Sequence, residues 1–252
     1  MSDEISNRIK DASITESLRT ALADLAREVG SLLPALPDDQ RGHVTFLLNR
    51  VIEEGTTLSI DDHWWEVALD LVAKAIHKLG ETGQSATAAI ETLIPLLRQQ
   101  LGPYEDVTLR EIRMDTVGII CRLSDTLTEP KKHYVATNAI SLAQAHFNPY
   151  AWFRAIYAGK APVGFLLLED PDENQDYFLL RFMIAEPYHG RGYGRQAIER
   201  LVEYVKTRPG GTELVLCCGQ GEGSPEGFYL ELGFEHTGKK IADEVVLHKT
   251  LL

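Results

Sequence analysis

The sequence predicts two domains of different class: an all-α domain followed by an α+β domain. Through residues 1–102, apolar side chains recur at spacings of three and four, which is typical of helices. After Gly102-Pro103 the spacing changes to the alternation typical of strands, with helical stretches in between. A Gly-Pro pair interrupts helices and strands alike, so Gly102-Pro103 marks the boundary between the two patterns. We therefore predict a helical bundle over residues 1–102 and a mixed domain over residues 103–252.

Four helices are expected in the first domain, joined by short polar links that favour an antiparallel bundle. The first helix is expected from Ile14 to Leu33. Three more should begin at residues able to cap them, and the last of these contains Pro95, which should kink or split it. The expected caps and ranges are Asp38 before 39–52, Asp62 before 63–80, and Ser85 before 86–101.

His63-Trp64-Trp65 is an unusual cluster at the start of the third helix. Two adjacent side chains cannot both face one stripe of a helix, so two interpretations are open, of which the first leaves one tryptophan exposed. An exposed tryptophan leaves a substrate contact or a homodimer contact open. Packing of one ring in the core and the other against the second domain is the alternative.

The second domain should contain five strands, with a helix from Gly192 to Lys206. Interleaved strands and helices are typical of an α+β domain of ordinary size. The last strand is expected at an edge of the sheet. The expected strands are 107–112, 162–169, 177–184, 213–218 and 245–250.

Composition excludes several classes of function. The net charge is -12, and both domains carry more acidic than basic residues, so no nucleic-acid partner is expected. No stretch approaches 18 apolar residues and the N-terminus has no apolar signal region, so we expect a cytoplasmic protein without a membrane contact. The 3 cysteines form no metal-binding spacing and suggest no disulfide framework. We expect them to be reduced and buried, and we expect no metal.

A glycine-rich loop joins the strand ending at Ile184 to the helix from Gly192. Its glycines, Gly190, Gly192 and Gly194, allow the backbone to approach a ligand closely. The N–H groups at a helix start favour a phosphate or pyrophosphate. A turn without any ligand also explains the glycines. A dinucleotide-binding fold is disfavoured because the loop lies late in the chain, and a Walker loop is excluded by its sequence.

This loop resembles the acetyl-CoA-binding motif of the GNAT acetyltransferase superfamily, Gln/Arg-x-x-Gly-x-Gly/Ala. Gly192 and Gly194 match the motif, and His189 stands where the family usually has Gln or Arg. The segment 224–234, Ser-Pro-Glu-Gly-Phe-Tyr-Leu-Glu-Leu-Gly-Phe, resembles a second motif of the family. The usual asparagine before that motif is Glu222 here. The resemblance covers residues 107–252 and implies a mixed sheet flanked by helices.

More specifically, the domain resembles the spermine/spermidine acetyltransferase branch. Residues 134–145 and the strand at 181–184 carry that likeness. It implies transfer of acetyl from acetyl-CoA to a small cationic amine, most simply a polyamine. Two alternatives stay open: acetylation of an amine-bearing antibiotic, and an acyl-CoA-binding sensor without turnover.

The resemblance also implies roles for individual residues. Tyr229 is the expected acid for the departing thiolate, although packing beside Phe228 and Phe234 is the alternative. The backbone of one strand should hold the thioester and pantetheine, and the loop should hold pyrophosphate. The expected cofactor-binding residues are Phe182, Met183, Ile184, His189, Gly190, Arg191, Gly192, Tyr193, Gly194 and Arg195.

The base is not assigned, because the family position that carries a glutamate in some polyamine enzymes is Leu180 here. Four carboxylates are candidates for a base or for a substrate anchor, and each is equally explained as a solvated surface group. Tyr134 and Asn138 either line the amine cleft or serve in capping and packing. Arg181 needs a partner if buried. The four carboxylates are Glu111, Glu129, Glu169 and Asp170.

Overall fold

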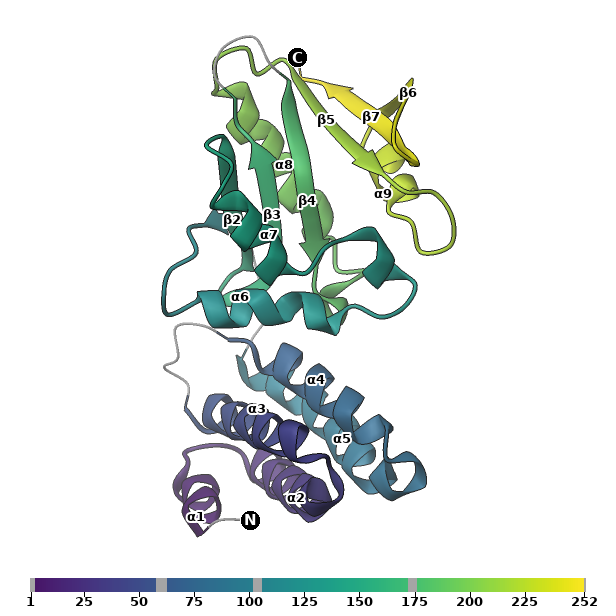
Figure 1. Cartoon of the computed structure of the whole chain (residues 1–252). Coiled ribbons are helices and arrows are strands. Elements are labelled where there is room, and N and C mark those ends of the chain that lie inside the picture. Colours follow the sequence, from purple (N-terminus) through teal and green to yellow (C-terminus); the bar gives the residue numbers. More distant parts are fainter. Residues whose placement is uncertain (1–2, 58–62, 102–105, 172–175, 252) are drawn as a thin grey trace. The chain divides into compact units, whose positions relative to one another are not determined.

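The chain forms two compact units, Met1–Tyr104 and Glu105–Leu252. A computed structural model describes residues 3–57, 63–101, 106–171 and 176–251 (Figure 1). The domain boundary expected at Gly102-Pro103 and the cap expected at Asp62 both lie outside these residues.

The first unit is entirely helical, and most of its helices begin and end close to the expected positions. Thr15 caps the second helix, because its side chain accepts a hydrogen bond from the Leu18 N–H. The first helix is short and strongly polar and was not expected. The helices are α1 (Asp3–Asp11), α2 (Glu16–Leu32), α3 (Asp38–Thr56), α4 (Trp65–His77) and α5 (Gln84–Leu101).

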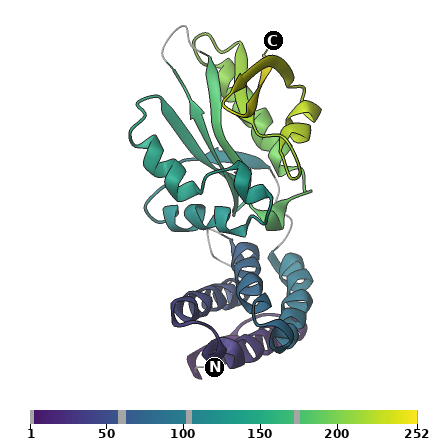
Figure 2. The same ribbon diagram turned by 45° about the vertical axis from the view of Figure 1, so that its right-hand side comes forward.

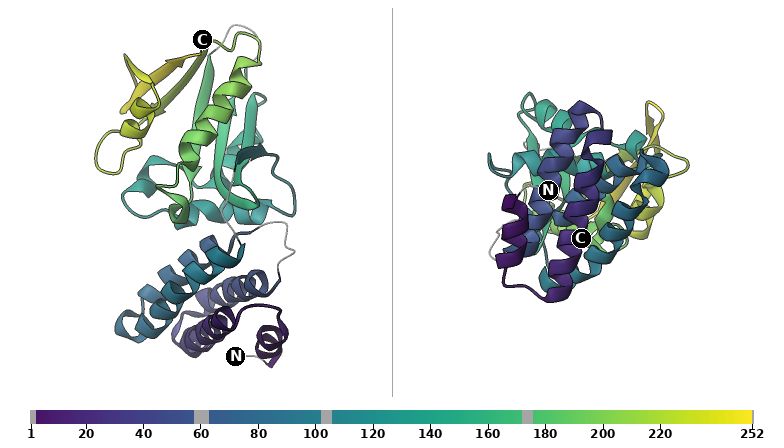
Figure 3. Two further views of the ribbon diagram at one scale, coloured as in Figure 1. Left: turned by 180° about the vertical axis from the view of Figure 1, so that it is seen from behind. Right: turned by 90° about the horizontal axis from the view of Figure 1, so that it is seen from below.

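Helix α2 packs against α5, and α3 packs against α4, as the views of Figures 1 and 3 show. The apolar stripes face one another, so Leu22, Leu25 and Trp65 are fully buried. Helix α5 runs unbroken through Pro95, so the expectation of a split is wrong. Pro95 is exposed, whereas Leu93 and Leu97 on either side of it are buried and hold the helix against the core.

The interpretation with one exposed tryptophan is excluded, because both Trp64 and Trp65 are buried. Trp64 precedes the helix rather than belonging to it, so its ring is free to turn inward. The carboxylate of Glu54 lies beneath this turn and accepts hydrogen bonds from the N–H groups of both tryptophans, at 3.0 and 3.1 Å. Arg50 Nε donates to the same carboxylate at 2.7 Å. Glu54 thus caps α4 from a neighbouring helix.

Titration of Glu54 should make the stability of the first unit depend on pH. Burial raises the pKa of Glu54 to about 7, although Arg50 and the tryptophan N–H groups favour the carboxylate. The folded unit therefore holds a proton that the unfolded chain loses near pH ~4.3. The contribution of Glu54 to the free energy of unfolding should be greatest below that pH. It should fall by on the order of 3 kcal/mol as pH rises to about 7.

We expect Glu54→Gln to remove this part of the pH dependence. The measurement is thermal unfolding between pH 4.5 and 7.5, followed by tryptophan fluorescence in a Trp152→Phe background. The remaining tryptophans, Trp64 and Trp65, then both report on the first unit. Glu53→Gln is the matched control, because Glu53 is a neighbouring exposed carboxylate. An unchanged pH dependence in Glu54→Gln would contradict the assignment.

The second unit is built on a seven-stranded sheet in the order β1-β2-β3-β4-β5-β7-β6. Every neighbouring pair is antiparallel except β4 and β5, which are parallel. Strand β7, expected at the edge, lies between β5 and β6. Strands β2 and β6 were not expected. The strands are β1 (Val107–Arg110), β2 (Ala151–Ala158), β3 (Ala161–Glu169), β4 (Tyr177–Ile184), β5 (Glu213–Cys218), β6 (Glu235–Ile241) and β7 (Glu244–Thr250).

Helices cover both faces of this sheet. Helices α6 (Val117–Leu123) and α7 (Asn138–Ala145) lie over the face turned to the viewer in Figures 1 and 2. Helix α8 (Tyr193–Lys206) crosses the opposite face, as the left view of Figure 3 shows. Because it is covered on both sides, β3 is buried along 161–168 without alternation. The structure confirms the predicted α+β class and the mixed sheet flanked by helices.

The parallel strands β4 and β5 pair over only part of their length. Tyr177–Leu179 pair with Leu214–Leu216, and the two strands then diverge (Figure 1). A bulge at Leu180 marks the divergence, since Leu179 and Arg181 pair with consecutive residues of β3. Beyond the bulge, one edge of β4 is therefore left open as far as Ile184.

Candidate active site

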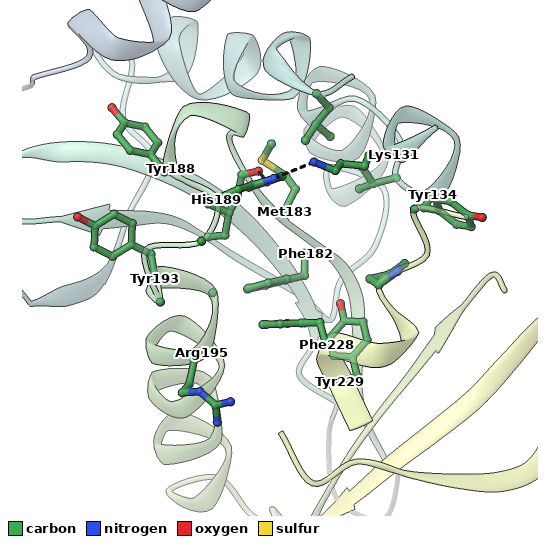
Figure 4. Close-up of a pocket in the computed structure, with 18 of the residues that line it drawn as sticks. Lys131, Tyr134, Phe182, Met183, Tyr188, His189, Tyr193, Arg195, Phe228 and Tyr229 are labelled. Carbon is green, nitrogen blue, oxygen red and sulfur yellow. Dashed lines mark hydrogen bonds between the residues drawn. The ribbon is translucent and has the colours of Figure 1, made fainter. Parts of the chain in front are cut away.

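A pocket of about 470 Å³ lies where β4 diverges from β5 (Figure 4). Four segments of the chain form its wall: the α6–α7 connection, the end of β4, the start of α8, and the segment around α9 (Glu226–Glu231). The lining residues are Leu127, Lys131, Tyr134, Val135, Phe182, Met183, Ile184, Tyr188, His189, Gly190, Gly192, Tyr193, Gly194, Arg195, Gly223, Pro225, Phe228, Tyr229 and Glu231.

The end of β4 presents backbone groups to this pocket. The Ala185 N–H donates to Val163 O of the β3 side at 2.8 Å. Backbone direction alternates along an antiparallel pair, so the N–H and C=O groups of Phe182 and Ile184 face the opening. On that side His189 Nε2 lies at hydrogen-bond distance, 2.7 Å, from the Ile184 carbonyl oxygen. Strand β4 can thus pair with an extended ligand as though it were a further strand.

The glycine-rich loop turns directly from this strand into α8. Gly190 and Gly192 adopt left-handed φ angles of 74° and 81°. Gly192 is the N-cap of α8, and no side chain caps the helix. The N–H groups of the first turn therefore lie at the pocket wall without intrahelical partners. Together with the helix dipole, they form a site suited to a phosphate group.

Tyr229 lies on α9, on the side of the pocket opposite this loop, and its side chain is buried. Its ring meets those of Phe228 and Phe234 edge to face, with centroids at 5.2 and 5.6 Å. Burial, followed by the nearby thiols of Cys218 and Cys217, raises the pKa of Tyr229. The phenol therefore stays protonated at neutral pH and can donate a proton into the pocket.

The model of the acetyltransferase (GNAT) family matches residues 120–234, a span that includes the pocket's loop and Tyr229. The match places this segment of the second unit in the GNAT acetyltransferase family. As a member of that family it is an N-acetyltransferase domain. No curated protein sequence matches the chain.

Several solved structures resemble this GNAT domain at low identity. An acetyltransferase from Thermus thermophilus is 19% identical, covers 59% of this chain and 99% of its own, and has a TM-score of 0.47. The PaiA N-acetyltransferase from Thermoplasma acidophilum, solved with coenzyme A, is 15% identical, covers 57% of this chain and 99% of its own, and has a TM-score of 0.43. The ribosomal-protein-S18-alanine N-acetyltransferase from Escherichia coli is 12% identical, covers 58% of this chain and 94% of its own, and has a TM-score of 0.46.

The structure brings the predicted cofactor-binding residues of the GNAT domain into the pocket wall, with one exception. Arg191 lies outside the lining: its guanidinium donates to Pro187 O at 2.7 Å and lies over the ring of Tyr188 at 5.2 Å. Arg195 is exposed, lines the pocket and makes no ion pair with the described residues. Of the two arginines, Arg195 is the one placed to meet an anion.

The predicted amine-site residues separate into two groups. Tyr134 lines the pocket and ties its wall together, because its hydroxyl donates to Glu222 O at 3.0 Å. Asn138 is fully buried behind that wall, where its side-chain amide donates to Ile120 O at 2.7 Å. Glu129 is exposed and pairs with His133 at 2.8 Å, outside the lining. Asn138 therefore packs in the interior, as the alternative interpretation has it.

The other candidate carboxylates also lie outside the pocket lining. Glu111 lies 3.8 Å from Arg154, and Glu169 accepts a hydrogen bond from the Asn148 side chain at 2.8 Å. Asp170 accepts hydrogen bonds from Tyr204 and Arg208. These are structural contacts around the sheet.

Arg181 finds the partner that a buried arginine needs, but among the described residues that partner is not a carboxylate. Its guanidinium donates to Leu180 O at 2.7 Å and to the Gln144 side chain at 3.3 Å. Both acceptors are neutral, so this half-buried arginine is held by carbonyl groups.

Sequence reasoning missed several lining residues, notably Lys131, Tyr188, Phe228 and Glu231. The ring of Phe228 stacks on that of Phe182 with centroids 5.9 Å apart and an interplanar angle of 12° (Figure 4). Phe228 lies inside the second family motif, next to Tyr229, which was the available signal. Lys131 begins a 3-10 helix, η4 (Lys131–Tyr134), that has no periodic pattern.

In the parts of the chain that the structure describes, no cluster of His, Cys, Asp or Glu is placed to hold a metal ion. None of the described helices has the length and apolar character needed to cross a membrane. The three cysteines are free thiols, of which only Cys218 is buried; Cys121 and Cys217 are half-buried, contrary to expectation.

Proposed function

We propose that the chain transfers the acetyl group of acetyl-CoA directly to a primary amine of a small cationic substrate, most simply a polyamine. One observation carries the proposal: an uncapped helix start, an open strand edge and a protonated tyrosine line a single pocket. The net charge of -12 favours a cationic substrate. The likeness of residues 134–145 and 181–184 to spermine/spermidine acetyltransferases supports a polyamine.

The residues present fit acetyl-CoA as a cosubstrate. The uncapped N–H groups after Gly192 offer donors for pyrophosphate, and Arg195 adds a positive charge at the same wall. The open edge of β4 offers the backbone groups of Phe182 and the N–H of Ile184 to the amide groups of the pantetheine arm. The half-exposed ring of Phe182 and the ring of Phe228 supply apolar surface beside that path.

The chemistry then follows from these positions. The neutral amine nitrogen attacks the thioester carbonyl carbon, and a backbone N–H of β4 stabilises the negative charge on the carbonyl oxygen. The carbon–sulfur bond breaks, and Tyr229 protonates the departing thiolate and then regains a proton from solvent. A free alkyl ammonium has a pKa of ~10.4, so the nitrogen must lose protons, and solvent is the acceptor we assign. The pocket holds both reactants in line, which contributes to the rate.

The test is release of free CoA thiol by the purified full chain with acetyl-CoA and a panel of amines. The panel contains spermidine, spermine, putrescine, aminoglycosides and short peptides, with an amine-free reaction to measure hydrolysis. We expect thiol release that depends on a polyamine. Turnover with aminoglycosides alone would instead identify an antibiotic-modifying activity. Tight acetyl-CoA binding without turnover on any amine would refute the transferase proposal and favour an acyl-CoA sensor.

A further inference from the structure

A chain of polar side chains links the two sides of the pocket (Figure 4). Lys131 Nζ donates to Glu186 Oε1 and lies 3.2 Å from His189 Nδ1. His189 Nε2 in turn lies 2.7 Å from the Ile184 carbonyl oxygen. Lys131 belongs to η4, whereas Glu186 and His189 belong to the turn after β4. The network therefore connects the α6–α7 connection with the strand edge proposed to hold the pantetheine arm.

The partners of His189 determine its tautomer. A carbonyl oxygen only accepts, so Nε2 must carry the proton that is shared with Ile184. A lysine ammonium only donates, so Nδ1 must present its lone pair to Lys131. Glu186 Oε1 lies 3.4 Å from the same Nδ1 and takes the lysine's charge. With Nε2 as the donor and Nδ1 as the acceptor, the orientation of the ring is fixed from both sides.

Glu186 is anchored independently of His189. Thr128 donates to Glu186 Oε2 from both its N–H and its hydroxyl, each at 3.3 Å. The Glu186 N–H donates to the Thr126 hydroxyl at 2.9 Å. Burial alone would raise the pKa of Glu186, but Lys131 and the Thr128 N–H hold it below its usual value. The carboxylate therefore stays charged and keeps Lys131 in place.

We propose that Lys131 and His189 are positioning residues that hold the α6–α7 connection, which carries the lining residue Tyr134, in register with the open edge of β4. This inference rests on the proposed acetyl transfer. His189 replaces the Gln or Arg of the family motif, and its side chain is directed to β4 and Lys131. The backbone glycines and Arg195, which face the phosphate groups, do not depend on it. The network therefore sets the transfer rate and the KM for the amine, and leaves the affinity for acetyl-CoA nearly unchanged.

The first test compares Lys131→Met and His189→Leu with the wild-type chain. Each variant should lower kcat/KM for the amine by about tenfold, the size expected for loss of a hydrogen bond to a charged group. The Kd for acetyl-CoA, measured by calorimetry, should stay within about threefold. Because the two residues act through one network, kcat/KM of the double variant should be only slightly lower than that of the more impaired single variant. Lys132→Met is the matched control, since Lys132 is exposed and outside the network.

His189→Gln provides a conservative rescue. A glutamine amide can donate to the Ile184 carbonyl and accept from Lys131, so most of the rate should return. A Gln variant as impaired as Leu, or a Kd for acetyl-CoA that rises in parallel with the loss of rate, would overturn the positioning role. An equal loss in Lys132→Met would do the same.

A second measurement does not depend on turnover. Nitrogen-15 NMR of the full chain should show the His189 ring as the neutral Nε2–H tautomer, and Lys131→Met should let Nδ1 exchange partners. An Nδ1–H tautomer in the wild-type chain would overturn the network whatever the assays show. Absence of turnover with every amine, together with the expected tautomer, would refute the proposed function and with it the role in transfer, while leaving the geometry in place.

Discussion

Replacing Tyr229 by phenylalanine is expected to lower turnover by about 10²-fold or more, because general acid catalysis typically contributes that much. The change removes only the hydroxyl, so the ring keeps its contacts with Phe228 and Phe234. Both the fold and the affinity for acetyl-CoA should therefore be nearly unchanged. The measurement is kcat from thiol release, together with the Kd for acetyl-CoA by calorimetry.

Tyr150→Phe is the matched control, because Tyr150 is an exposed tyrosine outside the pocket lining. It should behave as the wild-type chain does. Wild-type turnover in Tyr229→Phe would remove the acid role and leave Tyr229 as a packing residue. A loss of acetyl-CoA affinity equal to the loss of rate would assign the hydroxyl to binding instead.

Gly192→Val is expected to abolish acetyl-CoA binding. Gly192 has a φ of 81° at the N-cap of α8, a conformation that a β-branched residue adopts only with strain of roughly 1–3 kcal/mol. Relief of that strain would rotate the uncapped N–H groups away from the pocket. We expect the Kd measured by calorimetry to rise by on the order of 100-fold or more, as several hydrogen bonds to a charged group are lost.

Gly210→Val separates backbone strain from binding. Gly210 has a φ of 69° in the turn after α8 and lies outside the pocket lining. The variant should lower the thermal stability by a similar amount yet bind acetyl-CoA normally. Retained affinity in Gly192→Val would refute the loop as the phosphate site.

The elements that position the site were predictable because local signals agree with one another. Strand β4 shows the expected apolar pattern, and the glycines that follow it mark the turn into α8. Strand β6 was missed because both of its faces are solvated at the sheet edge, so it shows no apolar alternation. Strand β2 was missed because its second half is buried on both faces, which also removes the alternation.

The site was predictable only where its residues are close in sequence. The glycine loop and Tyr229 lie within two motifs, whereas the contact of Lys131 with Glu186 spans 55 residues. No pattern in the sequence of Lys131–Tyr134 predicts that contact, because it depends on how the α6–α7 connection crosses the sheet. Trp64 was misjudged for a related reason, since it stands just before the first residue of α4 and does not follow the geometry of that helix.

The partial pairing of β4 with β5 divides the sheet mechanically. Strands β1–β4 form one plate and β5–β7 another, and the plates are joined along three residue pairs, Tyr177 to Leu214, Phe178 to Val215 and Leu179 to Leu216. A ligand that forms hydrogen bonds with β4 and packs on α9 would join the two plates across this short junction. Its binding free energy is then also a contribution to folding, by linkage. Without such a ligand the domain should open most readily along this short junction.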